Sequence, residues 1–268
     1  MAAAAYRVVR AERPARSWLV MLHGATQHCG LFDTQEAHFR RDRHLLLVDL
    51  PGHGRSSHLP GPYGLVEYAT SVSRALDEAG VGDAHFWGTH TGAAVGLLLA
   101  AETPRKFRSL VLEGAVLPGR AMPYVASAFA RAVDVTKRHG VEAAKRDWFE
   151  TAAFFDAIRA DPVACRSEQH ARLLGDFAGG PWIDTAVPAT VPDLTGRLGT
   201  FPMPTLLVNG EHDLTDFLAT ADFLASALPE ARRATIATAG AFPLWERPQL
   251  VNPLVESWVN RVDEAATK

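Results

Sequence analysis

Short apolar runs alternate along the chain with longer segments in which apolar positions recur at helical spacing. Segments with helical spacing predict helices at 66–79, 92–102 and 216–227. The apolar runs predict strands at 17–22, 45–50, 85–88, 109–113, 204–209 and 233–238. This alternation is typical of parallel strands joined by right-handed crossovers. We therefore expect an α/β fold with a doubly wound, mostly parallel sheet and a site at the carboxyl ends of its strands.

The segment 120–199 interrupts this alternation, because it contains helical patterns but no good strand. It is also rich in aromatic residues: Phe129, Trp148, Phe149, Phe154, Phe155, Phe177 and Trp182. About 80 residues between two strands exceed what one crossover needs. We predict an inserted helical cap at 120–199, with 1–119 and 200–268 forming one core domain. A set of ordinary crossover helices is the alternative.

Composition narrows the class of partner. Twenty-seven Lys and Arg residues stand against 30 Asp and Glu, a net charge of −3, so no basic field exists for nucleic acid or an anionic membrane. The longest apolar stretches, such as 93–101, are too short to span a membrane. We expect a small-molecule ligand, with no nucleic-acid or membrane partner. The oligomeric state is left open, a homodimer included.

The ends and the cysteines suggest a cytoplasmic setting. Residues 1–5 are alanine-rich, but Arg7 and Arg10 follow without a secretory pattern. Cys29 and Cys165 are too few for a disulfide framework. The histidines show no metal-ligand spacing, so we expect neither a metal nor a cofactor.

The motif with the clearest chemical meaning is G-T-H-T-G at residues 88–92, between the strand at 85–88 and the apolar helix that follows it. The sequence G-x-S-x-G carries the nucleophile of a hydrolase in this same context of strand, sharp turn and helix. Glycines flank such a nucleophile because the turn is too tight for side chains. Here the nucleophile position is occupied by His90.

Four further motifs extend the pattern over most of the chain. They are H-G at 23–24, D-L-P-G-H-G-R-S at 49–56, N-G-E-H-D at 209–213 and G-A-F-P-L-W-E-R-P at 240–248. In their order and spacing the five motifs resemble the α/β-hydrolase superfamily, in the type with a helical cap. The resemblance implies that Asp213 is the triad acid and that Ala241 stands where the family has its catalytic histidine. No histidine follows His212, so nothing in the C-terminal loop replaces the missing one.

These substitutions exclude an ordinary Ser-His-Asp mechanism and suggest another use of the fold. Because Ala241 leaves space beside the elbow, we hypothesise that His90 turns toward Asp213 and forms a dyad, directly or through one water. The carboxylate would then raise the basicity of the imidazole. The resemblance also implies oxyanion-stabilising backbone N–H groups at Ala25 and Thr91. We predict general acid–base chemistry on a bulky, apolar, carbonyl-bearing molecule, by a lyase, isomerase or cyclase, with secondary metabolism as the working hypothesis for its setting.

Two other functions remain open. His90 can activate water or form an acyl-imidazole in an atypical hydrolase, or it can merely fill space in a ligand-binding protein without activity. Phe242 or Trp245 can also close the space that the dyad needs. His23, His53, Glu246 and Pro248 fit structural roles, and the cap aromatics either pack the cap or contact ligand. The residues predicted to line the pocket are Gly24, His28, Cys29, Thr89, Trp148, Ala241, Phe242 and Trp245.

Overall fold

The computed structural model describes residues 1–266. Its seven strands form one sheet in the order β1-β3-β2-β4-β5-β6-β7. Only β1 is antiparallel to its neighbour, β3. The strands are β1 (Tyr6–Val9), β2 (Trp18–Leu22), β3 (His44–Val48), β4 (Ala84–Thr89), β5 (Phe107–Glu113), β6 (Thr205–Gly210) and β7 (Ala231–Ile236). The expected doubly wound, mostly parallel sheet is confirmed, and all six predicted strands are present. The edge strand β1 was not predicted, since its four half-buried residues give little apolar contrast.

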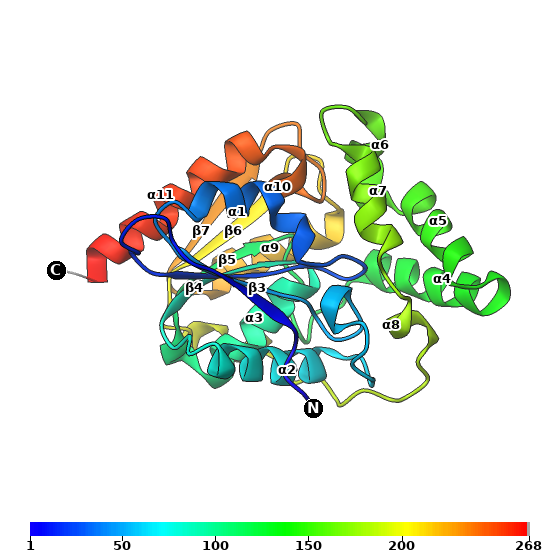
Figure 1. The fold of residues 1–268 in the computed structure, drawn as a ribbon, viewed down its shortest axis with the longest axis horizontal. Helices are drawn as coiled ribbons and strands as arrows, with labels where there is room; N and C mark the ends of the chain where they lie inside the picture. Colours follow the sequence, from blue (N-terminus) through cyan, green and yellow to red (C-terminus); the bar gives the residue numbers. More distant parts are fainter. Residues whose placement is uncertain (267–268) are drawn as a thin grey trace.

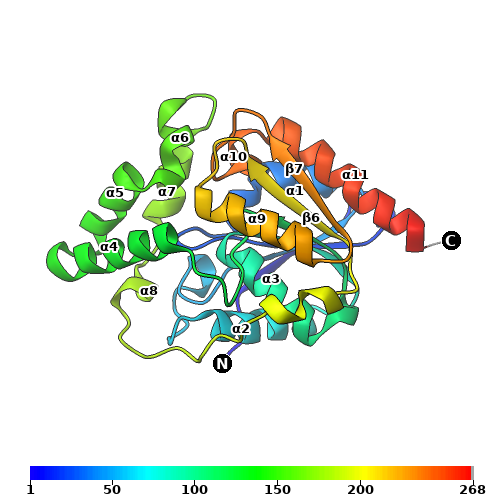
Figure 2. The same cartoon turned by 180° about the vertical axis from the view of Figure 1, so that it is seen from behind.

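Side chains alternate between the two faces of the sheet, and each face has its own apolar core. On β2, Leu19 and Met21 join one cluster while Val20 and Leu22 join the other. Helices α1 (Asp33–Phe39) and α11 (Pro248–Ala266) cover the first face, and α2 (Leu65–Glu78) and α3 (Thr91–Glu102) cover the second (Figures 1 and 2). Helix α9 (Thr215–Ala227) follows β6. The predicted helices correspond to α2, α3 and α9, whereas α1 and α11 were not predicted.

The segment between β5 and β6 forms helices that lie together beside one end of the sheet (Figures 1 and 2). They are α4 (Pro123–His139), α5 (Val141–Thr151), α6 (Asp156–Ala160), α7 (Ser167–Gly175) and α8 (Gly180–Ile183). Shorter turns complete the fold: α10 (Pro243–Glu246) and the 3₁₀ helices Cys29–Phe32, Gly54–Ser56, Pro104–Lys106, Ala153–Phe155 and Thr195–Thr200. The boundaries of a separate cap at 120 and 199 stay a prediction.

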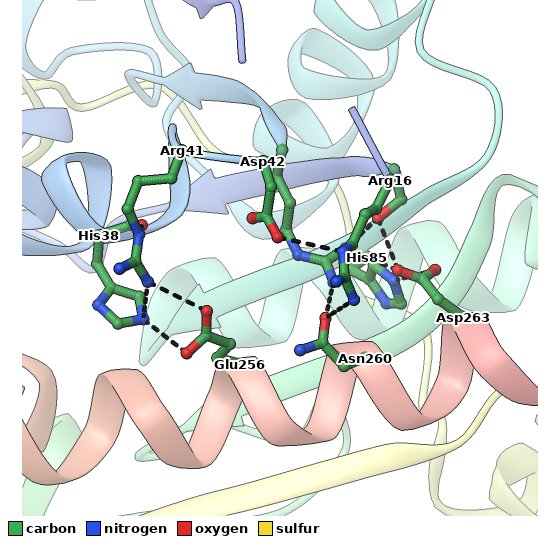
Figure 3. Close-up of polar contacts among 10 residues, drawn as sticks. Arg16, His38, Arg41, Asp42, His85, Glu256, Asn260 and Asp263 are labelled. Carbon is green, nitrogen blue, oxygen red and sulfur yellow. Dashed lines mark hydrogen bonds and ion pairs between the residues drawn. The ribbon is translucent and has the colours of Figure 1, made fainter. Parts of the chain in front are cut away.

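The C-terminal helix α11 is attached to the sheet by polar contacts (Figure 3). Asp263 accepts from Arg43 at 2.8 Å and from Arg108 at 2.9 Å, and lies 3.0 Å from His85 Nε2. Further along the helix, Glu256 pairs with His38. These contacts fix α11 against the first face. Within residues 1–266, no helix has both the length and the apolar character that crossing a bilayer requires.

Candidate active site

The elbow places His90 between the end of β4 and the start of α3. Its backbone has φ 46° and ψ −109°, a conformation that costs free energy for any residue other than glycine. Two backbone hydrogen bonds hold it there. The His90 N–H donates to the Glu113 carbonyl at 2.9 Å, and the His90 carbonyl accepts from Ala94 N–H at 3.1 Å. The neighbouring strand β5 and the first turn of α3 therefore fix the position of the His90 backbone, from which the imidazole extends.

Glycines make this turn and its imidazole fit. A Cβ at Gly88 would lie 2.5 Å from the Gly92 carbonyl, and one at Gly92 would lie 2.2 Å from the Leu22 carbonyl oxygen. Gly114, just after β5, has φ +53°, and a Cβ there would lie 2.5 Å from Cδ2 of His90. The flanking glycines were predicted from the motif. The sequence did not predict that the His90 ring needs the space left by the missing Cβ of Gly114.

Aromatic rings enclose the imidazole. Phe217 stacks on it with centroids 4.7 Å apart, and Phe242 meets it edge to face at 4.9 Å. Within residues 1–266, Nε2 of His90 is buried without a hydrogen-bond partner. Burial lowers the pKa of His90 to about 4, and contact with the Ala241 backbone opposes this change only in part. The ring is therefore neutral at neutral pH.

The structure does not form the direct His90–Asp213 dyad. Asp213 accepts from Asn209 Nδ2 and from Leu214 N–H, each at 2.8 Å. No hydrogen bond or ion pair joins it to His90 in the described part of the chain. Burial raises the pKa of Asp213 to about 7, against the effect of its two hydrogen bonds. The pKa of His90 is thus lowered by burial, whereas we had expected the carboxylate to raise it.

The loop after β7 explains why the dyad is not formed. Glu246 accepts hydrogen bonds from the N–H groups of Gly240 and Phe242, which fixes the loop across Ala241. Phe242 consequently lies against His90, in the region that we expected the imidazole to enter. The imidazole therefore has the Phe242 ring beside it and also contacts the Ala241 backbone. A dyad bridged by water stays a prediction.

His90 is one of the residues that line a pocket, whose empty volume of about 360 Å³ includes space open to solvent. Ala25 and Thr91 also line it, and their N–H groups donate to no acceptor within residues 1–266. The predicted oxyanion donors and His90 are thus brought together. The remaining walls are mainly aromatic, formed by Phe129, Trp148, Phe154, Phe155, Phe217 and Phe242.

Other residues predicted to line the pocket lie elsewhere. Gly24 packs against His90 Nδ1, Thr89 is buried within β4, and Ala241 is buried in the core. Trp245 donates through Nε1 to the Cys165 carbonyl at 2.6 Å, facing the inserted helices. None of these four is among the residues that line this pocket.

His28 and Cys29 line a separate hollow together with Asp49. Their ligand atoms lie within 4.8 Å of one another, a grouping that spacing did not reveal because two loops contribute to it. Asp49 already accepts from the N–H groups of Cys29 at 2.7 Å and Arg55 at 3.0 Å. Burial raises the pKa of the Cys29 thiol to about 12, which opposes thiolate formation. These side chains are therefore better suited to stabilising the loop than to binding a metal ion.

Three buried residues near the site were not predicted from the sequence. Phe217 lies in the first turn of α9, four residues after Asp213. Glu113 ends β5, where its Oε1 accepts from Leu244 N–H at 3.2 Å and burial raises its pKa well above the usual range. His170 of α7 lies 4.9 Å from the Phe242 ring, centroid to centroid. Only Glu113 had a signal, as a charged residue ending an apolar strand.

Comparison with known proteins gives a consistent result. The family model described as alpha/beta hydrolase fold matches residues 17–248. A putative carbamate hydrolase RutD from Azorhizobium caulinodans is 28% identical over 82% of both chains. The 3-oxoadipate enol-lactonase 2 of Acinetobacter baylyi is 24% identical over 94% of this chain and 91% of its own. The structure of MenH from S. aureus superposes with a TM-score of 0.79 at 23% identity, covering 96% of this chain and 98% of that one.

Proposed function

Because the chain belongs to the α/β-hydrolase superfamily, we propose that it is a cofactor-independent enzyme that uses His90 to move a proton on a carbonyl-bearing, largely apolar small molecule. One observation carries the proposal. The imidazole of His90 shares a small aromatic pocket with the unpaired N–H groups of Ala25 and Thr91. This combines a proton acceptor with donors suited to a developing oxyanion. The reaction class is that of a lyase, isomerase or cyclase.

The chemistry begins with the neutral imidazole, which accepts a proton from the carbon beside the carbonyl group. The C–H electron pair moves into a carbon–carbon double bond, and the carbonyl π pair moves onto oxygen. The resulting enolate accepts hydrogen bonds from the Ala25 and Thr91 N–H groups. The imidazolium then returns its proton to another atom of the enolate, which completes an isomerisation. In a lyase, the enolate instead expels a leaving group that takes this proton.

A pKa of about 4 makes His90 a weak base in the empty pocket. Proton transfer changes this, because it creates an enolate beside the imidazolium. Opposite charges attract strongly in an apolar pocket that excludes water. The ligand itself therefore raises the basicity of the imidazole as the reaction proceeds, and Asp213 need not contact the ring.

The relatives favour carbonyl-bearing substrates and also support a second function. A carbamate and an enol-lactone each contain a carbonyl group, and the names of these relatives denote their hydrolysis. Hydrolysis here would require His90 to activate water or to form an acyl-imidazole. Turnover of chromogenic esters that His90→Ala abolishes would establish this second function. A ligand-binding protein without activity would bind neutral ketones tightly and leave them unchanged.

Deuterium exchange tests the proposal without knowledge of the substrate. We expect the protein to accelerate exchange at the carbon beside the carbonyl of 1-tetralone in D₂O, followed by NMR. His90→Ala should reduce this rate about 100-fold or more, since general acid–base groups contribute on that scale. Asp213→Asn should change it much less if no water-bridged dyad forms, because Asp213 accepts its hydrogen bonds from Asn209 and Leu214. Equal rates for the wild-type protein and His90→Ala would refute the proposal.

A further inference from the structure

A second chamber adjoins the pocket at His90. Its empty volume of about 610 Å³ includes space open to solvent, and it lies between the loop before α2 and the inserted helices α4 and α8. Ala25, Thr26, Thr91 and Phe129 line both spaces. We call the pocket at His90 the reaction chamber and this second space the distal chamber. These four shared residues make the two spaces immediate neighbours.

The wall of the distal chamber is a connected set of rings. His53 stacks on Phe177 with centroids 5.0 Å apart, and Tyr68 meets His53 at 6.1 Å. Phe177 in turn meets Trp182 edge to face at 4.9 Å. Trp182 lies 5.8 Å from Trp148, which lines the reaction chamber. A chain of contacting aromatic rings, most of them edge to face, therefore links the linings of the two chambers.

Two polar atoms of the residues that line this space are buried without a protein partner in the described part of the chain. Nε2 of His53 and Nε1 of Trp182 are buried without a hydrogen bond within residues 1–266. The hydroxyls of Tyr68, Thr26 and Thr91 also belong to the lining, but they are not among these buried, unpartnered atoms. Buried polar groups without partners destabilise a protein, and a ligand that pairs them removes this cost. Together with the Tyr68 hydroxyl, these two atoms give a largely apolar lining a few neutral hydrogen-bonding groups.

The chemistry of these groups is that of a neutral hydrogen-bonding site. Nδ1 of His53 donates to the Pro51 carbonyl at 3.0 Å, so Nε2 is an acceptor. Burial lowers the pKa of His53 to about 3, which keeps the ring uncharged. Trp182 supplies a donor, and the Tyr68 hydroxyl can do either. Together they suit an alcohol, which both donates and accepts.

Charge is absent from both walls. Among the described residues, none of those lining either chamber is Lys, Arg, Asp or Glu. A ligand carboxylate would be buried there without a counter-ion, at a large desolvation penalty. Both chambers thus select against ionised ligands.

We infer that the distal chamber is a specificity subsite for an uncharged hydroxyl group, and that the substrate is a neutral, ring-containing ketone bearing this hydroxyl remote from its carbonyl. The inference rests on the proposed function for the position of the carbonyl at His90. The distal chamber's preference among ligands does not depend on turnover.

Binding of three matched probes tests the subsite: 6-hydroxymethyl-, 6-methyl- and 6-carboxy-1-tetralone, which differ only in the remote group. Affinities are measured by calorimetry in the wild-type protein and in His90→Ala. We expect the hydroxymethyl probe to bind about 3- to 10-fold tighter than the methyl probe. The carboxylate should bind at least about tenfold more weakly than either.

Tyr68→Phe removes a single oxygen atom and should reduce the advantage of the hydroxymethyl probe several-fold. Tyr6→Phe, the same change on the remote strand β1, should preserve it. The inference is overturned if the hydroxyl gives no advantage, if the carboxylate binds as well as the neutral probes, or if neither neutral probe binds. A preference for the hydroxyl without deuterium exchange would uphold the subsite and refute the proposed function. Deuterium exchange without a preference for the hydroxyl would uphold the proposed function and refute the subsite.

Discussion

The conformation of His90 depends on a residue in the neighbouring strand's loop. Its ring occupies the volume that a side chain at position 114 would need, because a Cβ on Gly114 would lie 2.5 Å from Cδ2 and 2.6 Å from Nε2. Phe217 and Phe242 contact the imidazole as well. The ring therefore has little room to move without displacing its neighbours. A change at Gly114 should affect chemistry through the position of His90 alone.

Gly114→Ala is the corresponding prediction. We expect loss of about 2–4 kcal/mol of unfolding free energy, from backbone strain at φ +53° and from overlap with the ring. The rate of deuterium exchange should fall at least tenfold. Gly80→Ala is the matched control, because Gly80 has φ +68° but nothing within 4 Å of its Cβ position. It should cost only about 1–2 kcal/mol in urea unfolding and leave exchange intact. Similar losses in both variants would contradict this account.

Among the secondary-structure elements, α11 shows how strongly burial changes the contribution of an ion pair to stability. Asp263 is 13% exposed and contacts Arg43, His85 and Arg108, and its pKa is lowered below the usual range despite desolvation. Glu256, on the same helix, is 31% exposed and pairs with half-exposed Arg41 (Figure 3). Water competes with the second pair far more than with the first. The two acids should therefore contribute very differently to the docking of α11.

Asp263→Asn should reduce the unfolding free energy by about 3 kcal/mol, since it leaves the buried Arg43 guanidinium without its carboxylate. Glu256→Gln should cost less than about 1 kcal/mol, as expected for an exposed pair. Urea unfolding of both variants measures the difference. Equal effects would show that the network around Asp263 does not anchor the helix.

At the scale of the whole molecule, the sequence predicted the features that short stretches of residues determine by themselves. Buried parallel strands appear in the sequence as short apolar runs, and two glycines flank His90 at the elbow. Both features were therefore predicted from the sequence. Helix α11 was not, because its periodicity is interrupted by Pro253. Neither was β1, whose pairing with β3 involves residues about 40 positions away.

The surroundings of His90 depend on tertiary packing, which no local pattern encodes. The position of Ala241 suggested an empty space, but Glu246 holds the loop so that Phe242 lies against the imidazole. Phe217 adds a second ring from α9, far from the elbow in sequence. His53 illustrates the same limit. It lies in a bend, as a structural role suggested, but its stacking on Phe177 of the insertion was not predicted.

Chemical rescue tests most directly whether the imidazole at the elbow performs the proton transfer. His90→Gly removes the ring at a backbone position with φ 46° that glycine adopts readily. We predict that this variant loses exchange of 1-tetralone about 100-fold and that added imidazole restores at least a tenth of the lost rate, saturably. Wild-type exchange in the variant without imidazole, or no recovery with it, would contradict the account.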